Sequence, residues 1–173
     1  MTPLVLTLIG DDRAGLVSAV AGAVSEHGGN WDRSQMAELA GKFAGIVLVT
    51  IPAGRVDEFT AALTPLQGLL DVTVQRADEA PAARVGMIRW SLELLGSDRP
   101  GIVSDISAVL ADHGVSIEAF SSLTREAPMA SGMLFEANAE LDVPTDADVD
   151  ALRAALEDLA HELMVDIDLG TAD

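Results

Sequence analysis

The sequence predicts an α+β protein built from two ferredoxin-like βαββαβ units, each with a four-stranded antiparallel sheet and two helices on one face. Three observations support this fold class. The chain repeats itself at a shift of 86 residues, most clearly in "GDDRAG" at 10–15 and "GSDRPG" at 96–101. Its strands alternate between apolar and polar residues, which is typical of antiparallel sheets with one covered face. Its helical segments carry apolar residues on one side only.

The repeat extends well beyond the two turns. Ten of the 23 ungapped columns from residue 6 to residue 28 are identical to those 86 residues later. Further along, the 3, 4, 3 spacing of one helix face recurs at a shift of 93, in Val56, Phe59, Leu63 and Leu66 and again in Val149, Leu152, Leu156 and Leu159. The second copy therefore carries about seven extra residues, which we expect in a loop.

The repeat divides the chain into a first unit at residues 1–76, a linker at 77–84 and a second unit at 85–173. The stretch "RADEAPAAR" at 76–84 has the polar, Pro- and Ala-containing composition of a linker. Each unit is expected to run strand, helix, strand, strand, helix, strand. This order, with both helices on one face of the sheet, is the split βαββαβ arrangement.

The second unit shows its first strand and helix most clearly. Apolar residues alternate with polar ones along the strand, at Ile88, Trp90, Leu92 and Leu94. The helix that follows is predicted to end at His113-Gly114, because a glycine there can adopt the left-handed conformation that ends helices. Its predicted apolar side consists of Ile102, Val103, Ile106, Val109 and Leu110.

Two more strands follow this helix. The first is predicted in "GVSIEAFSSLTRE" at 114–126, with Val115, Ile117 and Ala119 on the same face. The second alternates over eleven residues and is predicted to have one solvated face. Its predicted buried side is Met133, Phe135, Ala137, Ala139, Leu141 and Val143.

Charge and composition restrict the function. The 173 residues carry a formal net charge of -18. A charge of this sign repels phosphates, so direct nucleic-acid binding is not expected. The chain has no Cys, which excludes disulfides and thiolate metal sites. No apolar run is long enough to span a membrane, and no signal peptide is recognisable. We therefore expect a cytoplasmic protein that does not bind membranes.

The repeated turn lacks the lysine of a phosphate loop, so nucleotide binding is not predicted. One interpretation is purely structural: Asp12 and Asp98 cap the helices, Pro100 suits the first turn, and Gly15 and Gly101 give clearance. A second interpretation adds a ligand. A helix N-terminus offers N–H groups to a carboxylate, and a neighbouring Asp offers a partner for an ammonium group. Together these groups suit a free amino acid.

The stretch "LELLGSDRPGIVSDISAVLADHGVSIEAF" at 92–120 resembles an ACT domain, as does "LTLIGDDRAGLVSAVAGAVSEHGGNW" at 6–31. Two ACT domains without a catalytic domain resemble the glycine cleavage system transcriptional repressor family. The resemblance implies that a small amino acid binds where two ACT domains pack together, through the D-R-P-G turn and an Asn after the first helix. It also implies action through a DNA-binding activator protein rather than on DNA.

Each copy departs from this pattern at one position. The first copy has the Asn, as Asn30, but Ala14 replaces the proline of the turn. The second copy keeps the turn at residues 98–101 but has Ser116 in place of the Asn. Three arrangements remain open: one site shared between the copies, a weak site in each, or loss of binding in one. The effector-binding candidates are Asp12, Gly15, Asn30, Asp98, Gly101 and Ser116, whereas Arg13 and Arg99 are expected to face solvent.

Other sites find less support. Residues 146–157 place acidic side chains at positions 1, 3, 5 and 12 of a calcium loop, but Ala151 stands where that loop needs Gly. We instead expect a helix here, with Thr145 and Asp148 as a capping pair. The three His residues occur near predicted helix ends. No catalytic constellation can be assembled, so we expect neither an enzyme nor a cofactor or metal site.

The leading hypothesis is a non-catalytic regulatory protein that binds a small amino acid at ACT-domain interfaces and acts through a protein partner, with homodimers expected. A role in transcriptional regulation of glycine metabolism follows from the resemblance. The alternative is a structural interaction module that has lost effector binding, which the split motif favours. Trp31 lies beside Asn30 and should report binding by fluorescence.

Overall fold

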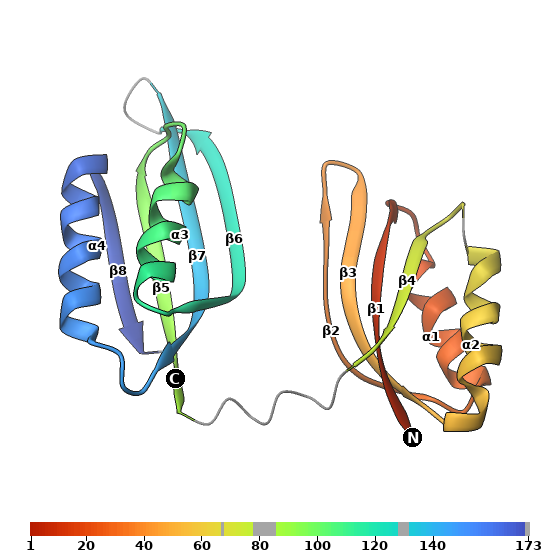
Figure 1. The fold of residues 1–173 in the computed structure, drawn as a ribbon. Coiled ribbons are helices and arrows are strands. Elements are labelled where there is room, and N and C mark those ends of the chain that lie inside the picture. Colours follow the sequence, from red (N-terminus) through yellow and green to blue (C-terminus); the bar gives the residue numbers. More distant parts are fainter. Residues whose placement is uncertain (67, 78–85, 128–131, 172–173) are drawn as a thin grey trace. The chain divides into compact units, whose positions relative to one another are not determined.

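The computed structural model describes residues 1–66, 68–77, 86–127 and 132–171. The chain divides into two compact units, residues 1–83 and 84–173, each with its own sheet and helices (Figure 1). Apart from Ala77, the linker predicted at 77–84 lies outside the described residues.

The first unit contains a four-stranded sheet in the order β2-β3-β1-β4, and every neighbouring pair is antiparallel. Both helices lie on one side of it (Figure 1). Its elements are β1 (Thr2–Asp11), α1 (Leu16–Glu26), β2 (Asn30–Leu39), β3 (Lys42–Ile51), the 3-10 turn η1 (Ala53–Arg55), α2 (Val56–Leu63), the 3-10 turn η2 (Thr64–Leu66) and β4 (Asp71–Arg76).

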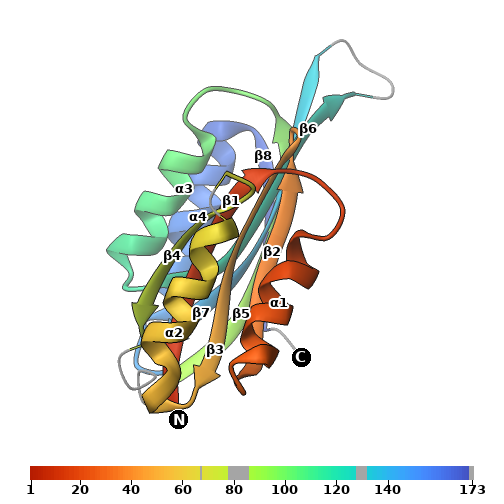
Figure 2. The ribbon, with the colours of Figure 1, turned by 90° about the vertical axis from the view of Figure 1, so that its right-hand side faces the viewer.

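The second unit repeats this topology, with strand order β6-β7-β5-β8. Figure 2 shows the helices of each unit on one side of that unit's own sheet. Its elements are β5 (Met87–Ser97), α3 (Ile102–Asp112), β6 (Ser116–Glu126), β7 (Met133–Pro144), α4 (Val149–Leu163) and β8 (Val165–Thr171). The predicted fold class, two βαββαβ units with antiparallel sheets, is confirmed.

Each unit has its own hydrophobic core between the sheet and the two helices. Phe59 of α2 and Leu152 of α4, which occupy matching positions in the two copies, are each 0% exposed. The predicted buried side of β7 is confirmed from Phe135 to Val143, whereas Met133 at its start is 43% exposed. Val103, predicted on the apolar side of α3, is 42% exposed, because only Ile102, Ile106 and Leu110 of that helix point fully into the core.

The phase predicted for β6 is wrong, because the strand contains a β-bulge. Ile117 pairs with Leu141 and Ala119 pairs with the next residue of β7, Glu140. Glu118 is therefore an extra residue of β6, inserted between two consecutive register positions of β7. Ala119 therefore shares a face with Glu140, while Ile117 shares a face with buried Leu141. The first unit has a bulge at the equivalent place, between Trp31 and Arg33.

The extra residues of the second copy lengthen one hairpin. β6 and β7 have 11 and 12 residues, whereas β2 and β3 have 10 each. The loop location predicted for the insertion is thus only partly right, because some of the added residues extend the two strands. Among the described residues, no helix is long and apolar enough to cross a membrane.

Candidate functional site

The two turns singled out in the sequence have the same backbone structure. Each links the end of a central strand, β1 or β5, to the first turn of a helix, α1 or α3. The backbone N–H of Asp12 donates to the carbonyl oxygen of Gly41 at 2.9 Å. In the second unit, the backbone N–H of Asp98 donates to the carbonyl oxygen of Met133 at 2.8 Å. These hydrogen bonds hold each turn against the neighbouring hairpin, which fixes its position at one end of the sheet.

Gly15 and Gly101 are the N-cap residues of α1 and α3, and no side chain caps either helix. The capping role predicted for Asp12 and Asp98 is therefore wrong, because both lie three residues before the N-cap position. Both glycines are left-handed, with φ of 96° and 98°. A Cβ at Gly15 would meet nothing within 4 Å, so the backbone conformation, rather than clearance, requires glycine here.

Replacing Gly15 or Gly101 with alanine is expected to lower the free energy of unfolding by about 1–2 kcal/mol, the strain of a left-handed residue that carries a Cβ. Urea unfolding monitored by Trp fluorescence measures this loss. Gly54→Ala is the control, because Gly54 has no positive φ and its Cβ would meet no atom within 4 Å. A loss at Gly54 as large as at Gly101 would contradict the conformational explanation.

The electrostatic surroundings of the two turns differ. In the second unit, Arg99 Nη2 lies 3.6 Å from Asp105 Oδ2, and Asp105 is in the first turn of α3. The corresponding residue of α1, 86 positions earlier, is Ala19, and the first turn of α1 has no acidic side chain. The positive end of the α3 dipole therefore already has a carboxylate beside it, that of Asp105. The first turn of α1 contains no such carboxylate.

Asn30 and Ser116 begin the strands that follow α1 and α3, immediately before the two bulges. Asn30 is exposed, and its Nδ2 donates to Asp32 Oδ1 at 2.5 Å within the bulge. Ser116 pairs in register with Asp142, which is 8% exposed and whose Oδ1 lies 3.8 Å from Arg89 Nε. The two strand starts therefore present different polar groups, an amide in one unit and a hydroxyl beside an acid in the other.

Within one unit the turn and the strand start lie at opposite ends of the sheet. Asp11 pairs with Lys42 and Asn30 pairs with Thr50, so eight residues of β3 separate the two ends. At the usual strand rise this is about 27 Å. β7 separates the ends of the second unit by the same number of residues, since Ser97 pairs with Leu134 and Ser116 with Asp142. Neither unit brings its own candidate residues together.

The H-G pairs that end α1 and α3 have a structural explanation. Nδ1 of His27 lies 2.7 Å from the carbonyl oxygen of Ala23, and Nδ1 of His113 lies 2.8 Å from that of Val109. Because a carbonyl oxygen only accepts, each Nδ1 carries the proton. Gly28 and Gly114 then take left-handed conformations, with φ of 68° and 70°, which confirms the prediction made for Gly114. These residues satisfy carbonyl groups at the helix end, so they need no ligand to explain them.

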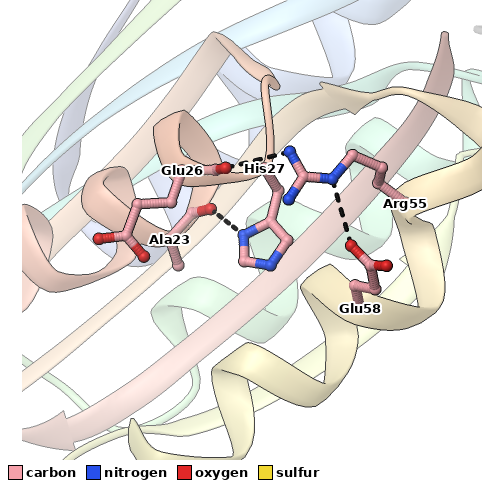
Figure 3. A network of polar contacts seen from close by, with 5 residues as sticks. All are labelled: Ala23, Glu26, His27, Arg55 and Glu58. Carbon is pink, nitrogen blue, oxygen red and sulfur yellow. Dashed lines mark hydrogen bonds and ion pairs between the residues drawn. The ribbon is translucent and has the colours of Figure 1, made fainter.

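The end of α1 is held further by Arg55 (Figure 3). Its Nη1 donates to the carbonyl oxygen of Glu26 at 3.1 Å, and its Nε lies 3.2 Å from Glu58 Oε2. The His27 ring meets Phe59 edge to face, with ring centroids 5.8 Å apart. These contacts link α1 to α2 just before Asn30, so the start of β2 is firmly positioned.

Gly10 and Gly96, the first residues of the repeated motif, play a structural role that sequence reasoning missed. A Cβ at Gly10 would lie 2.4 Å from the carbonyl oxygen of Leu69, and one at Gly96 would lie 2.3 Å from Val165 Cγ1. The absence of a side chain at these two glycines lets Leu69 approach β1 in the first unit and Val165 approach β5 in the second. Their repetition at the shift of 86 was the only signal in the sequence, and it did not distinguish this role from ligand binding.

A shallow hollow of about 330 Å³ lies on the helix-free face of the second sheet. Several of its lining side chains are acidic, so it does not suit a carboxylate ligand. The polar and apolar side chains that point into it are Glu93, Leu95, Glu136, Asn138, Asp166 and Asp168. None of the candidate residues from the two turns lies there.

The helix expected in place of a calcium loop at 146–157 is present in the structure. α4 begins at Val149, so most of the acidic stretch at 146–157 is helical rather than a loop. Its N-cap is Asp148, whose Oδ1 accepts from the N–H of Ala151 at 2.9 Å, and not Thr145 as the predicted pair implied. Among the described residues, no group of three His, Asp or Glu is placed to hold a metal ion.

Comparison with known proteins gives one family for both units. Residues 2–76 and 92–170 match the family model described as ACT domain. The glycine cleavage system transcriptional repressor of Escherichia coli is 25% identical to this chain. The match covers 92% of this chain and 85% of the repressor.

Two solved structures are similar over nearly the whole chain. The crystal structure of an unknown protein from Galdieria sulphuraria is 30% identical in sequence, and the match covers 99% of both chains with a TM-score of 0.89. A crystal structure provisionally assigned as a glycine cleavage system transcriptional repressor has a TM-score of 0.71 at 17% identity, and covers 99% of this chain and 98% of its own. The second match bears on the fold alone.

Proposed function

This chain belongs to the ACT domain family, and we propose that it is a non-catalytic regulatory protein that binds a small free amino acid between ACT units. A regulatory role is supported by the ACT domains and by the similarity to the Escherichia coli repressor. The proposal adds an effector, a shared binding site and a protein partner through which the effector acts.

The observation that carries this proposal is the paired placement of the candidate residues. Each unit has a glycine turn at one end of its sheet and a bulged strand start at the other, at the same sequence shift. Because about 27 Å separates them in one unit, a site that uses both must combine the turn of one unit with the strand start of another. Because the α1 turn and Asn30 belong to the same unit, a site that uses both takes them from two copies of this chain, whereas a site within one chain pairs Asn30 with the α3 turn.

The proposed ligand has both a carboxylate and an ammonium group. Its carboxylate would accept hydrogen bonds from the free N–H groups at the start of α1 or α3. The carboxylate side chain of Asp12 or Asp98, exposed beside the turn, would face its ammonium group. Of the two turns we favour that of α1, because Asp105 places a negative charge at the start of α3.

The partner we propose is a protein rather than DNA, because the net charge of -18 opposes binding to phosphates. Transcriptional control of glycine metabolism is the process we propose, by analogy with the Escherichia coli relative. Affinity should be modest. A five-heavy-atom ligand such as glycine reaches at most about -7.5 kcal/mol, a micromolar dissociation constant. That range suits a sensor of metabolite concentration.

The test is a titration of the full chain with each of the twenty amino acids, followed by Trp fluorescence and by the melting temperature. We expect one or a few small amino acids to bind, and a ligand at ten times its dissociation constant to stabilise the folded state by about 1.4 kcal/mol. Asn30→Ala should weaken binding by about tenfold or more, the loss of roughly one hydrogen bond to a charged group.

Asn138→Ala is the matched control, because Asn138 is also exposed but lies mid-strand on β7, away from both sheet ends. A folded sample that responds to no amino acid would sink the proposed effector site. The alternative, an interaction module without an effector, would then stand. It is favoured by one observation: Asp105 already places a carboxylate in the first turn of α3, directly after the more complete motif.

A further inference from the structure

The helix-free face of the first sheet is the side of β2-β3-β1-β4 opposite α1 and α2 (Figure 1). Strand pairing places Val5 opposite Leu48, Thr7 opposite Ile46 and Ile9 opposite Ala44 along its two central strands. Ile46 is 55% exposed and Ile9 is 52% exposed. Several apolar side chains are thus contiguous on a surface that neither helix of this unit covers, and such patches mark interaction sites.

Charge balance separates this face from its counterpart in the second unit. Apart from the bulge residue Asp32, the described strands of the first sheet place two acidic and two basic side chains on it, Asp11, Asp71, Arg33 and Lys42. Lys42 and Asp11 also form an ion pair with each other. The charges on this face therefore cancel.

The helix-free face of the second sheet is strongly negative. It carries Arg89 and Arg125 but six acidic side chains, in addition to the bulge residue Glu118: Glu93, Glu136, Glu140, Asp142, Asp166 and Asp168. Ile46 of the first sheet, opposite Thr7, corresponds here to Asn138, opposite Glu93. The two copies have kept one fold and diverged in the character of this surface.

We propose that the helix-free face of the first sheet packs against the same face of a second copy of this chain. Two chains that each carry a charge of -18 repel one another. Of the two helix-free faces, the one with balanced charges and an apolar centre opposes such repulsion less and offers apolar side chains for burial. The second sheet, with six acidic side chains on its face, would repel its own copy.

The size of the face suffices for such a dimer. Three strands of ten residues and one of six, about 4.8 Å apart, cover roughly 600 Å². Two such faces bury about 1,200 Å², the lower limit of the range for specific interfaces. Sheets that pack face to face lie about 10 Å apart and interleave their side chains, so Ile9 and Ile46 would become buried. The proposal goes beyond effector binding and does not depend on it.

Sedimentation equilibrium of the full chain without added amino acids tests this proposal. We expect a monomer–dimer equilibrium whose dissociation constant falls as salt rises from about 50 mM to about 500 mM, because salt screens the repulsion. Ile46→Glu should raise the dissociation constant at least tenfold. Asn138→Glu, at the corresponding position of the second sheet, should leave it within about twofold.

Circular dichroism and thermal melting check that both variants are folded, which we expect because both side chains are exposed. If Ile46→Glu does not fold, Ile46→Asn replaces it, since asparagine occupies the corresponding position in the second unit. The proposal is overturned by a monomer at every concentration, by a dimer indifferent to Ile46 substitution, or by a dimer that Asn138→Glu disrupts instead.

Discussion

Replacing Phe59 with alanine is expected to lower the free energy of unfolding of the first unit by about 3–5 kcal/mol. Phe59 is 0% exposed, packs within the core of that unit and meets the His27 ring edge to face. Its removal leaves a cavity between α2 and the sheet and also loses the contact that supports the end of α1. A loss of this size is a large part of the stability of a small domain.

The chain has two Trp residues, Trp31 in the first unit and Trp90 in the second, so single-Trp variants report each unit separately. Urea unfolding of Phe59→Ala is therefore followed through Trp31 in a Trp90→Phe background. The Nε1 of Trp90 is buried and has no hydrogen-bond partner among the described residues, which makes phenylalanine a mild replacement.

Leu152→Ala is the matched variant, because Leu152 occupies the corresponding position in α4 and is also 0% exposed. It should lower the stability reported by Trp90 in a Trp31→Phe background by about 2–5 kcal/mol. Each variant should act mainly on its own unit. Equal shifts of both transitions by either variant would contradict the division into two independent cores.

Gly96→Ala is the second large effect, an expected loss of about 3 kcal/mol, the upper part of the range for overpacking. The new Cβ would lie 2.3 Å from Val165 Cγ1 and 2.9 Å from Val165 Cα. Rotation of the Val165 side chain relieves the first contact but not the second, which involves the backbone. β5 and β8, which pair at these two residues, must therefore separate locally.

Urea unfolding reported by Trp90 measures this loss. Gly22→Ala is the control, because Gly22 lies inside α1 and a Cβ there would meet no atom within 4 Å. That substitution should raise the stability of the first unit by about 0.5–1 kcal/mol, since alanine favours the helix. If Gly96→Ala is as well tolerated as Gly22→Ala, close strand approach is not why the motif begins with glycine.

Much of the fold was predictable because it depends on local patterns. Alternation along 133–143 identified β7, and the apolar spacing around Phe59 and Leu152 identified α2 and α4. The failures were also local in origin. The phase of Ile117 and Ala119 was wrong because a bulge adds a residue without changing the composition of the strand.

The candidate site was predictable in its residue types but not in its arrangement. The left-handed backbone conformation of Gly28 and Gly114 can be inferred from the sequence, since a glycine after a helix commonly adopts it. The N-cap positions of Gly15 and Gly101 could not, because the three preceding residues offered an Asp that looked equally suitable. The binding roles of Asp12, Gly15, Asn30, Asp98, Gly101 and Ser116 stay predictions.

Sequence alone was enough to identify the duplication, the order of strands and helices in each unit, and the ACT family. These follow from identities at a constant shift and from apolar periodicity, both of which are properties of nearby residues. The folded structure was needed to show that Asn30 and the Gly15 turn lie at opposite ends of one sheet, and that one helix-free face is balanced in charge while the other is acidic. The difference comes from strand register, because register pairs residues far apart in the chain and so sets which side chains share an end or a face.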